Sequence, residues 1–310
     1  MGALAISQGF ASARSLQETH EIQAGFLSAC LWPQAGGRIA SLRFAPPGRT
    51  PLDILLPLTR TPFDPDFWPK GGCYPLVPWS NRIRNAQFSV DGRTIALRPH
   101  PACLPHAHHG FTHQRRWDLS NATPTTAQMS YTHSPDADAW PWAFIAVQTL
   151  RIAPDGLSID LSVTNVGTDP MPVGMGLHPF LVVSPGDEND FITKSEWRAD
   201  ADGLAISLSP VAGGAVHCVQ GSQGSTRYFA GWQGIAVLRR IEGARVTVTA
   251  SAPLDHLVFH VPEGGAYACL EPVSHVADAF NLAAKGVAKT GFLTLAAGQT
   301  LSTSVHIGVS

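Results

Sequence analysis

The sequence predicts an all-β fold, arranged as a sandwich or a barrel, and three observations predict it. Apolar and polar residues alternate in several short stretches, which is the period of a strand with one buried face. The 310 residues include 29 glycines and 25 prolines, an excess over ordinary usage that indicates many turns. Helical periodicity is confined to one short stretch. Strand patterns that recur along a whole chain, with turns between them, are typical of β-sandwiches and β-barrels.

The first clear element is a hairpin at residues 88–97. Asp91-Gly92 lies at its centre, and this pair accepts the positive φ angles of a two-residue hairpin turn. With the turn at that point, Phe88 and Ile95 are expected to face each other across the two strands. The pattern therefore predicts the register of the hairpin as well as its position.

The next clear strand alternates from Leu157 to Thr164 and follows the turn sequence Pro154-Asp155-Gly156. A short helix of one or two turns is expected between Val276 and Leu282. Further strands are predicted at residues 246–249, 257–261 and 301–307, the second of them more deeply buried.

Length, composition and charge limit the class of protein. The chain shows no internal repeat and no linker-like change of composition, so a single domain over residues 1–310 is expected. Charged residues make up 14% of the chain and hydrophobic ones 44%, which argues against disorder. The net charge is −2 and no basic run is present, so no nucleic-acid partner is expected. No apolar run approaches about 18 residues, so no membrane partner is expected either.

The cysteines and the N-terminal stretch bear on the compartment. Five cysteines, an odd number, are scattered without a CxxC motif, which suits the reducing cytoplasm and no disulfide framework. Residues 1–13 contain small and apolar residues but lack the positively charged start of a signal peptide. We therefore expect a cytoplasmic protein in which residues 1–13 are retained.

The segment at residues 71–83 surrounds polar and aromatic side chains with glycine and proline. Asn81 and Arg82 follow closely on Trp79, and together they offer several hydrogen-bond donors and one acceptor. That set suits a ligand with many hydroxyl groups. An arginine held in a structural contact near a hairpin is the alternative.

Histidines cluster at residues 106–113. His106 and His108 would place two imidazoles on one face of a strand, as in the metal sites of cupins, but no glutamate follows three or four residues on. The first carboxylate that follows is Asp118. Structural or surface histidines, or a single functional histidine at His109, are the alternatives to a metal site.

Two further residues qualify for proton transfer. His178 follows an apolar, glycine-rich stretch, and the ordinary histidine pKa of about 6.5 suits proton transfer near neutral pH. Glu271 stands at the end of an apolar strand, where a carboxylate that enters a cleft is a candidate general base. A structural histidine and a salt-bridged glutamate are the alternatives. The sequence has no GxSxG, P-loop or GxGxxG motif, which argues against serine hydrolysis and nucleotide binding.

In this order and spacing, the motifs resemble the aldose 1-epimerase (mutarotase) family of galactose mutarotase-like proteins. The matching pieces are PLVPWSNRI, the HG at His109, MPVGMGLHPF and CLEPVSHVADAFN, within a resemblance that extends from about Gly25 to Ile307. The resemblance implies a large antiparallel β-supersandwich in one domain. It also implies an isomerase that needs no metal or other cofactor and acts on a small-molecule sugar, and it leaves monomer and homodimer both open.

On matching positions, the resemblance implies that Glu271 is the general base for the anomeric hydroxyl and that His178 is the acid that protonates the ring oxygen. It further implies substrate contacts from Arg82, Asn81, His109 and Trp232, with Trp79 as a second aromatic face. Such a reaction opens the ring, rotates the C1–C2 bond and closes the ring on the other face of the carbonyl. One base and one acid on opposite sides of the sugar suffice if the glutamate is partly desolvated and the histidine is held protonated.

The sequence departs from the family pattern at one position. Thr226 stands where many members have an aspartate that contacts sugar hydroxyls. A neutral hydroxyl in place of a carboxylate removes a charge-assisted hydrogen bond, so the identity of the sugar is open. Arg227 beside it keeps acidic and phosphorylated sugars among the candidates.

Three other functions compete with an epimerase. Thr226 favours a sugar-binding or sugar-sensing protein on the same fold, although binding alone has no use for an acid–base pair. A cupin-like metalloenzyme would use His106, His108 and His109. A carbohydrate lyase or glycosidase is the third; glycosidases usually need two carboxylates about 5–10 Å apart, and the motifs reveal no second one.

Overall fold

The computed structural model describes residues 19–58, 63–64, 67, 69–135, 140–219 and 223–310. The fold is all-β, as predicted: two large antiparallel sheets, three two-stranded sheets, one short α-helix and four 3-10 turns account for the regular structure of these residues. In the same residues, no helix has the length and apolar character needed to cross a membrane. The N-terminal stretch 1–13 lies outside the described residues.

The first large sheet has 11 strands and carries the candidate site. In spatial order its strands are β1 (His20–Ala24), β2 (Leu27–Trp32), β3 (Arg38–Phe44), β5 (Cys73–Leu76), β15 (Gly176–Val182), β24 (Tyr267–Val273), β23 (His256–Val261), β20 (Ser225–Ala230), β17 (Ser195–Ala199) and β18 (Ala205–Pro210), with β4 (Leu52–Asp53) paired to β3.

The second large sheet has nine strands and packs against the first. In spatial order they are β10 (Asp118–Ser120), β11 (Thr126–His133), β12 (Phe144–Ala153), β13 (Gly156–Asn165), β26 (Thr300–Val309), β22 (Arg245–Ala250), β21 (Ile235–Arg239), β16 (Glu188–Ile192) and β19 (Ala215–Val219).

Short elements complete the fold. Pairs of strands are β6 (Arg82–Ile83) with β9 (Ala107–His108), β7 (Gln87–Val90) with β8 (Arg93–Ala96), and β14 (Met171–Val173) with β25 (Leu293–Leu295). The helical segments are α1 (Ala279–Ala284) and the 3-10 turns η1 (Pro33–Ala35), η2 (Arg84–Ala86), η3 (Pro101–Cys103) and η4 (Thr112–Gln114).

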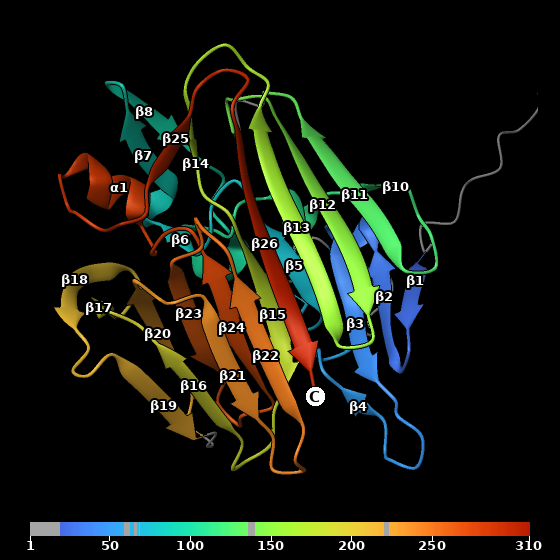
Figure 1. Ribbon diagram of the computed structural model, residues 1–310. Helices are drawn as coiled ribbons and strands as arrows, with labels where there is room; N and C mark the ends of the chain where they lie inside the picture. Colours follow the sequence, from blue (N-terminus) through green and yellow to red (C-terminus); the bar gives the residue numbers. More distant parts are fainter. Residues whose placement is uncertain (1–18, 59–62, 65–66, 68, 136–139, 220–222) are drawn as a thin grey trace, which may run out of the picture.

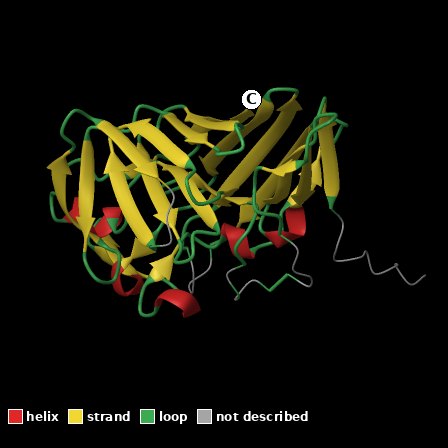
Figure 2. Ribbon diagram, turned by 90° about the horizontal axis from the view of Figure 1, so that it is seen from below, coloured by secondary structure: helices red, strands yellow, loops and turns green. Residues whose placement is uncertain are grey.

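The core lies between the two large sheets. Figure 1 shows β13, β26 and β22 of the second sheet in front of β5 and β15 of the first, and Figure 2 shows the strand layers with the helical segments along one side. Phe191 of β16 and Phe229 of β20 meet across this interface, with their ring centroids 4.9 Å apart. Because strand residues alternate between faces, the neighbours of Phe229 along β20 point to the opposite, outer face of the first sheet.

The predicted elements are present where the alternation placed them. The strand expected at 157–164 lies inside β13, and the hairpin of β7 and β8 pairs Phe88 with Ile95 in the predicted register. The helix expected within 276–282 is the short α1, which begins three residues later at Ala279. The strands expected at 246–249, 257–261 and 301–307 lie in β22, β23 and β26.

Candidate active site

The floor of the candidate site is a row of side chains that crosses five strands of the first sheet. Tyr74 pairs with His178, Glu271 pairs with Val258, and Val258 pairs with Tyr228. In the ladder between β15 and β24, Gly176 pairs with Val273 and Phe180 pairs with Cys269, so His178 and Glu271 lie at the same level on adjacent strands, midway between these two pairs. Directly opposed residues in a sheet share a face. Sheet pairing therefore brings the two predicted catalytic residues together from positions 93 apart in the chain.

A second row lies two residues further along the same strands. It consists of Phe180, Cys269, His260 and Thr226, each opposite the next across the ladder. Apart from Tyr74 and Cys269, the residues of the two rows line a cavity of about 180 Å³. The residues that line this cavity are Lys70, Asn81, Arg82, His108, His109, His178, Phe180, Thr226, Tyr228, Val258, His260, Tyr267 and Glu271.

The segments 77–83 and 105–111 form one wall of the cavity, and hydrogen bonds between them fix its shape. The Asn81 N–H donates to His109 Nδ1 at 3.0 Å, and the His109 N–H donates to the Asn81 carbonyl at 2.9 Å. Gly110 has a φ of +66°, and a Cβ there would lie 2.1 Å from the Val77 carbonyl oxygen. Only glycine fits this close approach. The glycine after His109 thus lets the two segments join and aims the imidazole at the cavity.

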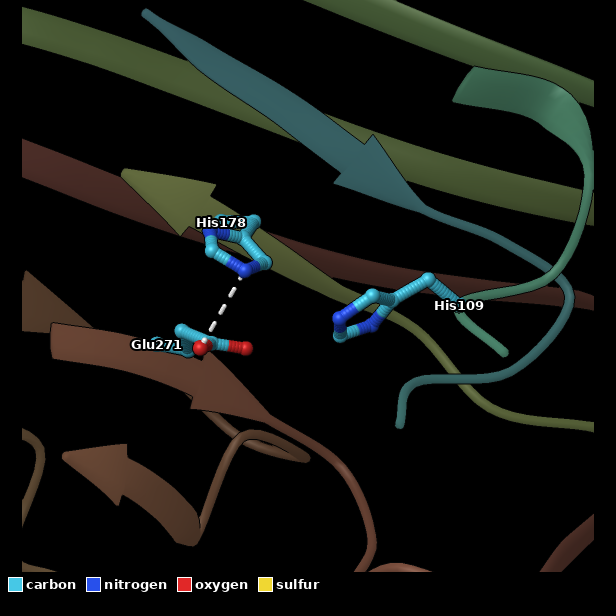
Figure 3. A group of neighbouring side chains, drawn as sticks. All are labelled: His109, His178 and Glu271. Atoms are coloured by element: carbon cyan, nitrogen blue, oxygen red, sulfur yellow. Dashed lines mark ion pairs between the residues drawn. The ribbon is translucent and has the colours of Figure 1, made fainter. Parts of the chain in front are cut away.

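Glu271 and His178 form the polar centre of the site (Figure 3). His178 Nε2 lies 3.3 Å from Glu271 Oε1, and each residue is only 3% exposed. The imidazole packs against the rings of Tyr74 and Phe180, with centroids 4.8 and 4.5 Å away. The second carboxylate oxygen, Oε2, is buried and accepts no hydrogen bond from the described residues. A buried acceptor without a donor is costly unless a ligand supplies one, so Oε2 is suited to a substrate hydroxyl.

Burial shifts the pKa values of Glu271 and His178 in the directions that favour a neutral carboxyl group and a neutral imidazole. It raises the pKa of Glu271 to about 8, against the opposing effect of the Lys70 ammonium. Burial also lowers the pKa of His178 well below its usual value, and the charges of Lys70, His260 and Arg38 lower it further. The expectation of a His178 held protonated is therefore not met in the free site. A single proton shared by the pair resides preferentially on the carboxyl group.

The close contact also changes the expected arrangement of acid and base. We expected them on opposite sides of a sugar, but a separation of 3.3 Å leaves no room for a ring between Glu271 and His178. They are neighbours on one floor because adjacent strands carry them at the same level. Both oxygens of a hemiacetal centre are bonded to the same carbon, so such a pair can reach both from one side.

His109 completes a triangle with this pair, and the three could hold a metal ion by distance alone. Their ligand atoms lie within 4.8 Å of one another. The His109 Nδ1 already accepts the Asn81 N–H, so the neutral ring carries its proton on Nε2. Burial lowers the pKa of His109 well below its usual value, which keeps the ring neutral. His109 therefore presents an N–H donor and no lone pair to the cavity, and the set suits proton transfer better than metal binding.

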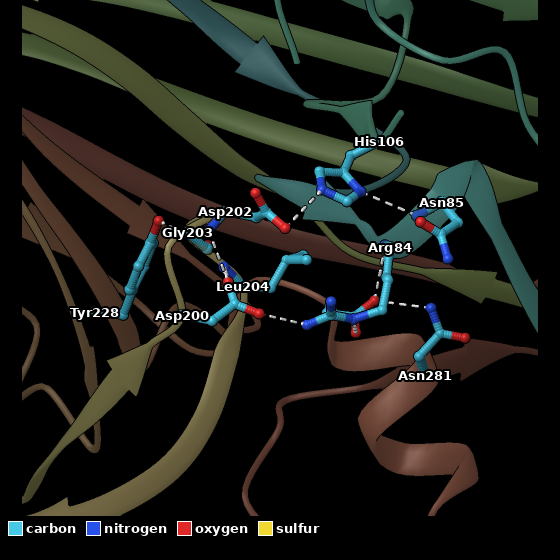
Figure 4. Close-up of polar contacts among 10 residues, drawn as sticks. Arg84, Asn85, His106, Asp200, Asp202, Gly203, Leu204, Tyr228 and Asn281 are labelled. Atoms are coloured by element: carbon cyan, nitrogen blue, oxygen red, sulfur yellow. Dashed lines mark hydrogen bonds and ion pairs between the residues drawn. The ribbon is translucent and has the colours of Figure 1, made fainter. Parts of the chain in front are cut away.

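The outer rim is built by the turn between β17 and β18. Asp200 Oδ1 accepts the N–H groups of Asp202 and Leu204, and the Tyr228 hydroxyl donates to the Gly203 carbonyl at 3.1 Å (Figure 4). A Cβ at Gly203 would lie 2.3 Å from Arg82 Nη1, so this turn presses directly on the guanidinium. The rim therefore fixes Arg82 in the wall of the cavity.

The structure places most of the predicted site residues in one cavity and excludes two. Glu271, His178, Arg82, Asn81 and His109 all line it. Trp232 does not line the cavity: it is 4% exposed, belongs to the core, and its Nε1–H donates to the Ile235 carbonyl. Trp79 likewise packs in the core, against Phe111 and Trp140.

The three histidines of the cupin hypothesis do not form a metal-ligand set, although the rings of His108 and His109 are neighbours. No group of three metal-ligating side chains in the described residues combines His106, His108 and His109. His106 accepts the Asn85 N–H and faces Asp202 instead.

Aromatic and basic residues that the sequence argument missed take the remaining positions. Phe180, Tyr228 and Tyr267 supply the aromatic surface that was expected from tryptophans. Lys70 supplies a positive charge and His260 an imidazole. Tyr228 could have been found from Thr226, since residues two apart on a strand share a face. No comparable signal marks Lys70, which precedes β5 in an irregular segment.

Solved structures of galactose mutarotase-like proteins share this fold. A galactose mutarotase-like protein from Clostridium acetobutylicum superposes with a TM-score of 0.80 over 95% of each chain, at 17% identity. A candidate aldose 1-epimerase from Escherichia coli K12 superposes with a TM-score of 0.81 over 95% of this chain and 99% of that one, at 22% identity. The likeness establishes the shared fold.

Sequence comparison gives the family. The model of the aldose 1-epimerase family matches residues 19–308, and the chain belongs to that family. The uncharacterized protein YphB of Escherichia coli K12 is 25% identical over 249 residues, which span 76% of this chain and 83% of YphB.

Proposed function

We propose that the protein is an aldose 1-epimerase that interconverts the α and β anomers of a sugar by acid–base ring opening. The observation that carries the proposal is the buried Glu271–His178 contact at the floor of a polar cavity, with Oε2 of Glu271 available to a hydroxyl. A binding protein gains nothing from burying such a pair, whereas a proton-transfer site requires it.

The reaction needs one base and one acid. Glu271 takes the proton of the anomeric hydroxyl while His178 gives a proton to the ring oxygen, so the bond between C1 and the ring oxygen breaks and a carbonyl forms. Rotation about C1–C2 presents the other carbonyl face, and the same two transfers run in reverse. In ring opening Glu271 gains one proton and His178 loses one, and in ring closure both transfers are reversed. The pair therefore returns to its starting state. Each positioned transfer contributes roughly 10²–10⁴-fold.

Neighbouring groups support each step. The carboxylate–imidazolium form that begins this sequence is the less favoured form of the free pair, and the Lys70 charge favours the carboxylate within it. The His109 Nε2–H and the Arg82 guanidinium are donors in the cavity wall, placed to stabilise negative charge that develops on an oxygen. The aromatic surface of Phe180, Tyr228 and Tyr267 suits the apolar faces of a sugar ring.

The proposal includes the compartment and the partner. We propose that the cavity binds a small-molecule sugar and that the protein acts in the cytoplasm. All five cysteines are free thiols, which is compatible with a reducing compartment.

Polarimetry on freshly dissolved α-D-glucose, α-D-galactose and other aldoses tests the proposal. Wild type should speed the approach to anomeric equilibrium, Glu271→Gln should abolish the acceleration while sugar binding persists, and His178→Asn should slow it strongly. Glu263→Gln, at an exposed site, is the matched control and should behave as wild type. Wild-type turnover by Glu271→Gln would refute the base assignment.

A sugar-binding or sugar-sensing protein is the second candidate. It is favoured by Thr226, whose hydroxyl is bonded to His260 Nδ1 at 2.8 Å where many family members have a carboxylate. Calorimetric binding of a sugar without any acceleration of its mutarotation would decide for this alternative.

A further inference from the structure

The cavity brings two cationic side chains together with a single carboxylate. Lys70, Arg82 and His260 line it, and Glu271 is the only carboxylate among its lining residues within the described parts of the chain. Burial lowers the pKa of His260, and the charges of Lys70 and Arg82 lower it further, so Lys70 and Arg82 carry the positive charge of the cavity and His260 contributes a neutral imidazole. The whole protein carries a net charge of −2, so this positive character is local.

The acidic residues beside the cavity already have polar partners elsewhere. The Arg84 guanidinium donates to Asp200 at 2.7 Å and lies 3.6 Å from Asp278, while Asp202 lies 3.8 Å from His106 Nε2 (Figure 4). These pairs hold the carboxylates in place and direct them toward partners outside the cavity.

Arg82 consequently keeps its charge available. Within the described residues, no carboxylate lies at ion-pair distance from its guanidinium, although the turn at Gly203 presses against it. A guanidinium fixed in a wall without a carboxylate is a ready partner for an anion, because its planar set of donors matches carboxylate and phosphate oxygens.

Arg227, which the sequence suggested as a contact for an anionic sugar, does not offer its charge to the cavity. The Arg227 guanidinium donates to both oxygens of Glu196, at 2.7 Å each. It lines an adjoining outer groove of about 660 Å³, which shares Arg82, Thr226 and Tyr228 with the cavity above Glu271, but it does not line that cavity. Its charge is therefore neutralised locally.

The hydrogen-bonding groups that line the cavity also favour an anionic ligand. Thr226 Oγ1 and His260 Nδ1 are bonded to each other, and the Tyr228 hydroxyl proton is given to the Gly203 carbonyl. Lys70, Arg82 and the His109 Nε2–H are donors only. A neutral sugar hydroxyl can donate as well as accept, whereas an anionic oxygen only accepts.

We propose that the substrate is an aldose with an anionic group, a carboxylate or a phosphate ester, on its carbon chain away from C1. Lys70, Arg82 and His260 bind this group while C1 lies over Glu271 and His178. The inference rests on the proposed epimerase function and names its substrate class.

The test compares anomer exchange by NMR for D-glucose, D-glucuronate and D-glucose 6-phosphate at low ionic strength. We expect kcat/KM for at least one charged sugar to exceed that for D-glucose by at least roughly tenfold, because charge-assisted hydrogen bonds are the strong ones. The two charged sugars distinguish a carboxylate from a phosphate ester. Added salt should reduce the preference, since it screens charges at an open cavity.

Lys70→Gln should reduce the ratio of charged to neutral kcat/KM several-fold, and Lys285→Gln is the control. Lys285 is exposed at the end of α1 and does not line the cavity, so this variant changes the net charge equally and should keep the ratio. Circular dichroism and thermal unfolding establish that both variants fold.

The outcomes separate the two proposals. If D-glucose exchanges as fast as or faster than the charged sugars, and Lys70→Gln does not change the ratio of charged to neutral kcat/KM, the anionic substrate is refuted. The epimerase function is not affected by that result. If no sugar exchanges faster but calorimetry shows a charged sugar bound at least tenfold more tightly than D-glucose, the charged ligand is supported and the epimerase fails. Absence of both exchange and binding for the charged sugars overturns the inference.

Discussion

Replacing Glu271 by glutamine should make the fold more stable at neutral pH while removing activity. The carboxyl pKa is 4.5 in its ordinary state, and burial raises it to about 8 in the folded protein. At pH 7 the unfolded chain therefore carries a carboxylate, and folding must add a proton to it. Each pH unit above the ordinary pKa costs about 1.4 kcal/mol, so the total at pH 7 is about 3 kcal/mol. Glutamine is neutral in both states and avoids this cost.

The pH dependence identifies the cause. For a group whose folded-state pKa is raised, stability is fully present below the unfolded pKa and is lost as pH rises through the folded pKa. The advantage of Glu271→Gln should therefore vanish near pH 4.5, grow through neutral pH and level off above about pH 8. The lowered pKa of His178 reduces stability in acid, but wild type and variant share that effect and it cancels in the difference.

The assay is urea unfolding followed by tryptophan fluorescence at several pH values from 5 to 8.5. Glu263→Gln, at an exposed carboxylate, should change the free energy of unfolding little at any pH. A Glu271→Gln variant that is less stable than wild type at pH 7, or whose advantage does not change with pH, would refute the argument from burial.

Three further predictions concern the site. The rate of wild-type mutarotation should fall above about pH 8 and persist to well below pH 6.5, because Glu271 and His178 must hold one proton between them. A loss of rate as the pH falls through 6.5 would contradict the lowered pKa of His178. His109→Leu should lower kcat/KM about 10²-fold through loss of the Nε2–H donor, as measured by polarimetry, and a loss below twofold would remove this residue from the mechanism. Gly110→Ala should lower the free energy of unfolding by about 1–3 kcal/mol and reduce activity, since its Cβ would meet the Val77 carbonyl; an unchanged melting temperature would speak against the clash.

Sequence patterns predicted the local structure well, because alternation and turn chemistry act over a few residues. The Asp91-Gly92 turn fixed the pairing of Phe88 with Ile95, and the alternation at 157–164 located β13. The motif residues Glu271 and His178 could be named from their residue types and context. Their contact could not, since alternation defines the face of a strand but not which strands are neighbours.

Tertiary structure decided the protonation and the charge of the site. Burial, which no sequence window reveals, raises the pKa of Glu271 and lowers that of His178, opposite to the charges expected for a free acid–base pair. Trp232 resembled a sugar platform in sequence but is enclosed in the core.

The chain by itself determined a β-rich fold and the residue types for proton transfer, since both follow from local composition and order. The order of the strands determined the rest. The strand order places His178 beside Glu271 and brings Lys70 and Arg82 to one cavity. It also pairs Arg227 with Glu196 outside that cavity. Coulombic interactions and desolvation depend on distances between residues far apart in sequence, and only the folded chain fixes those distances.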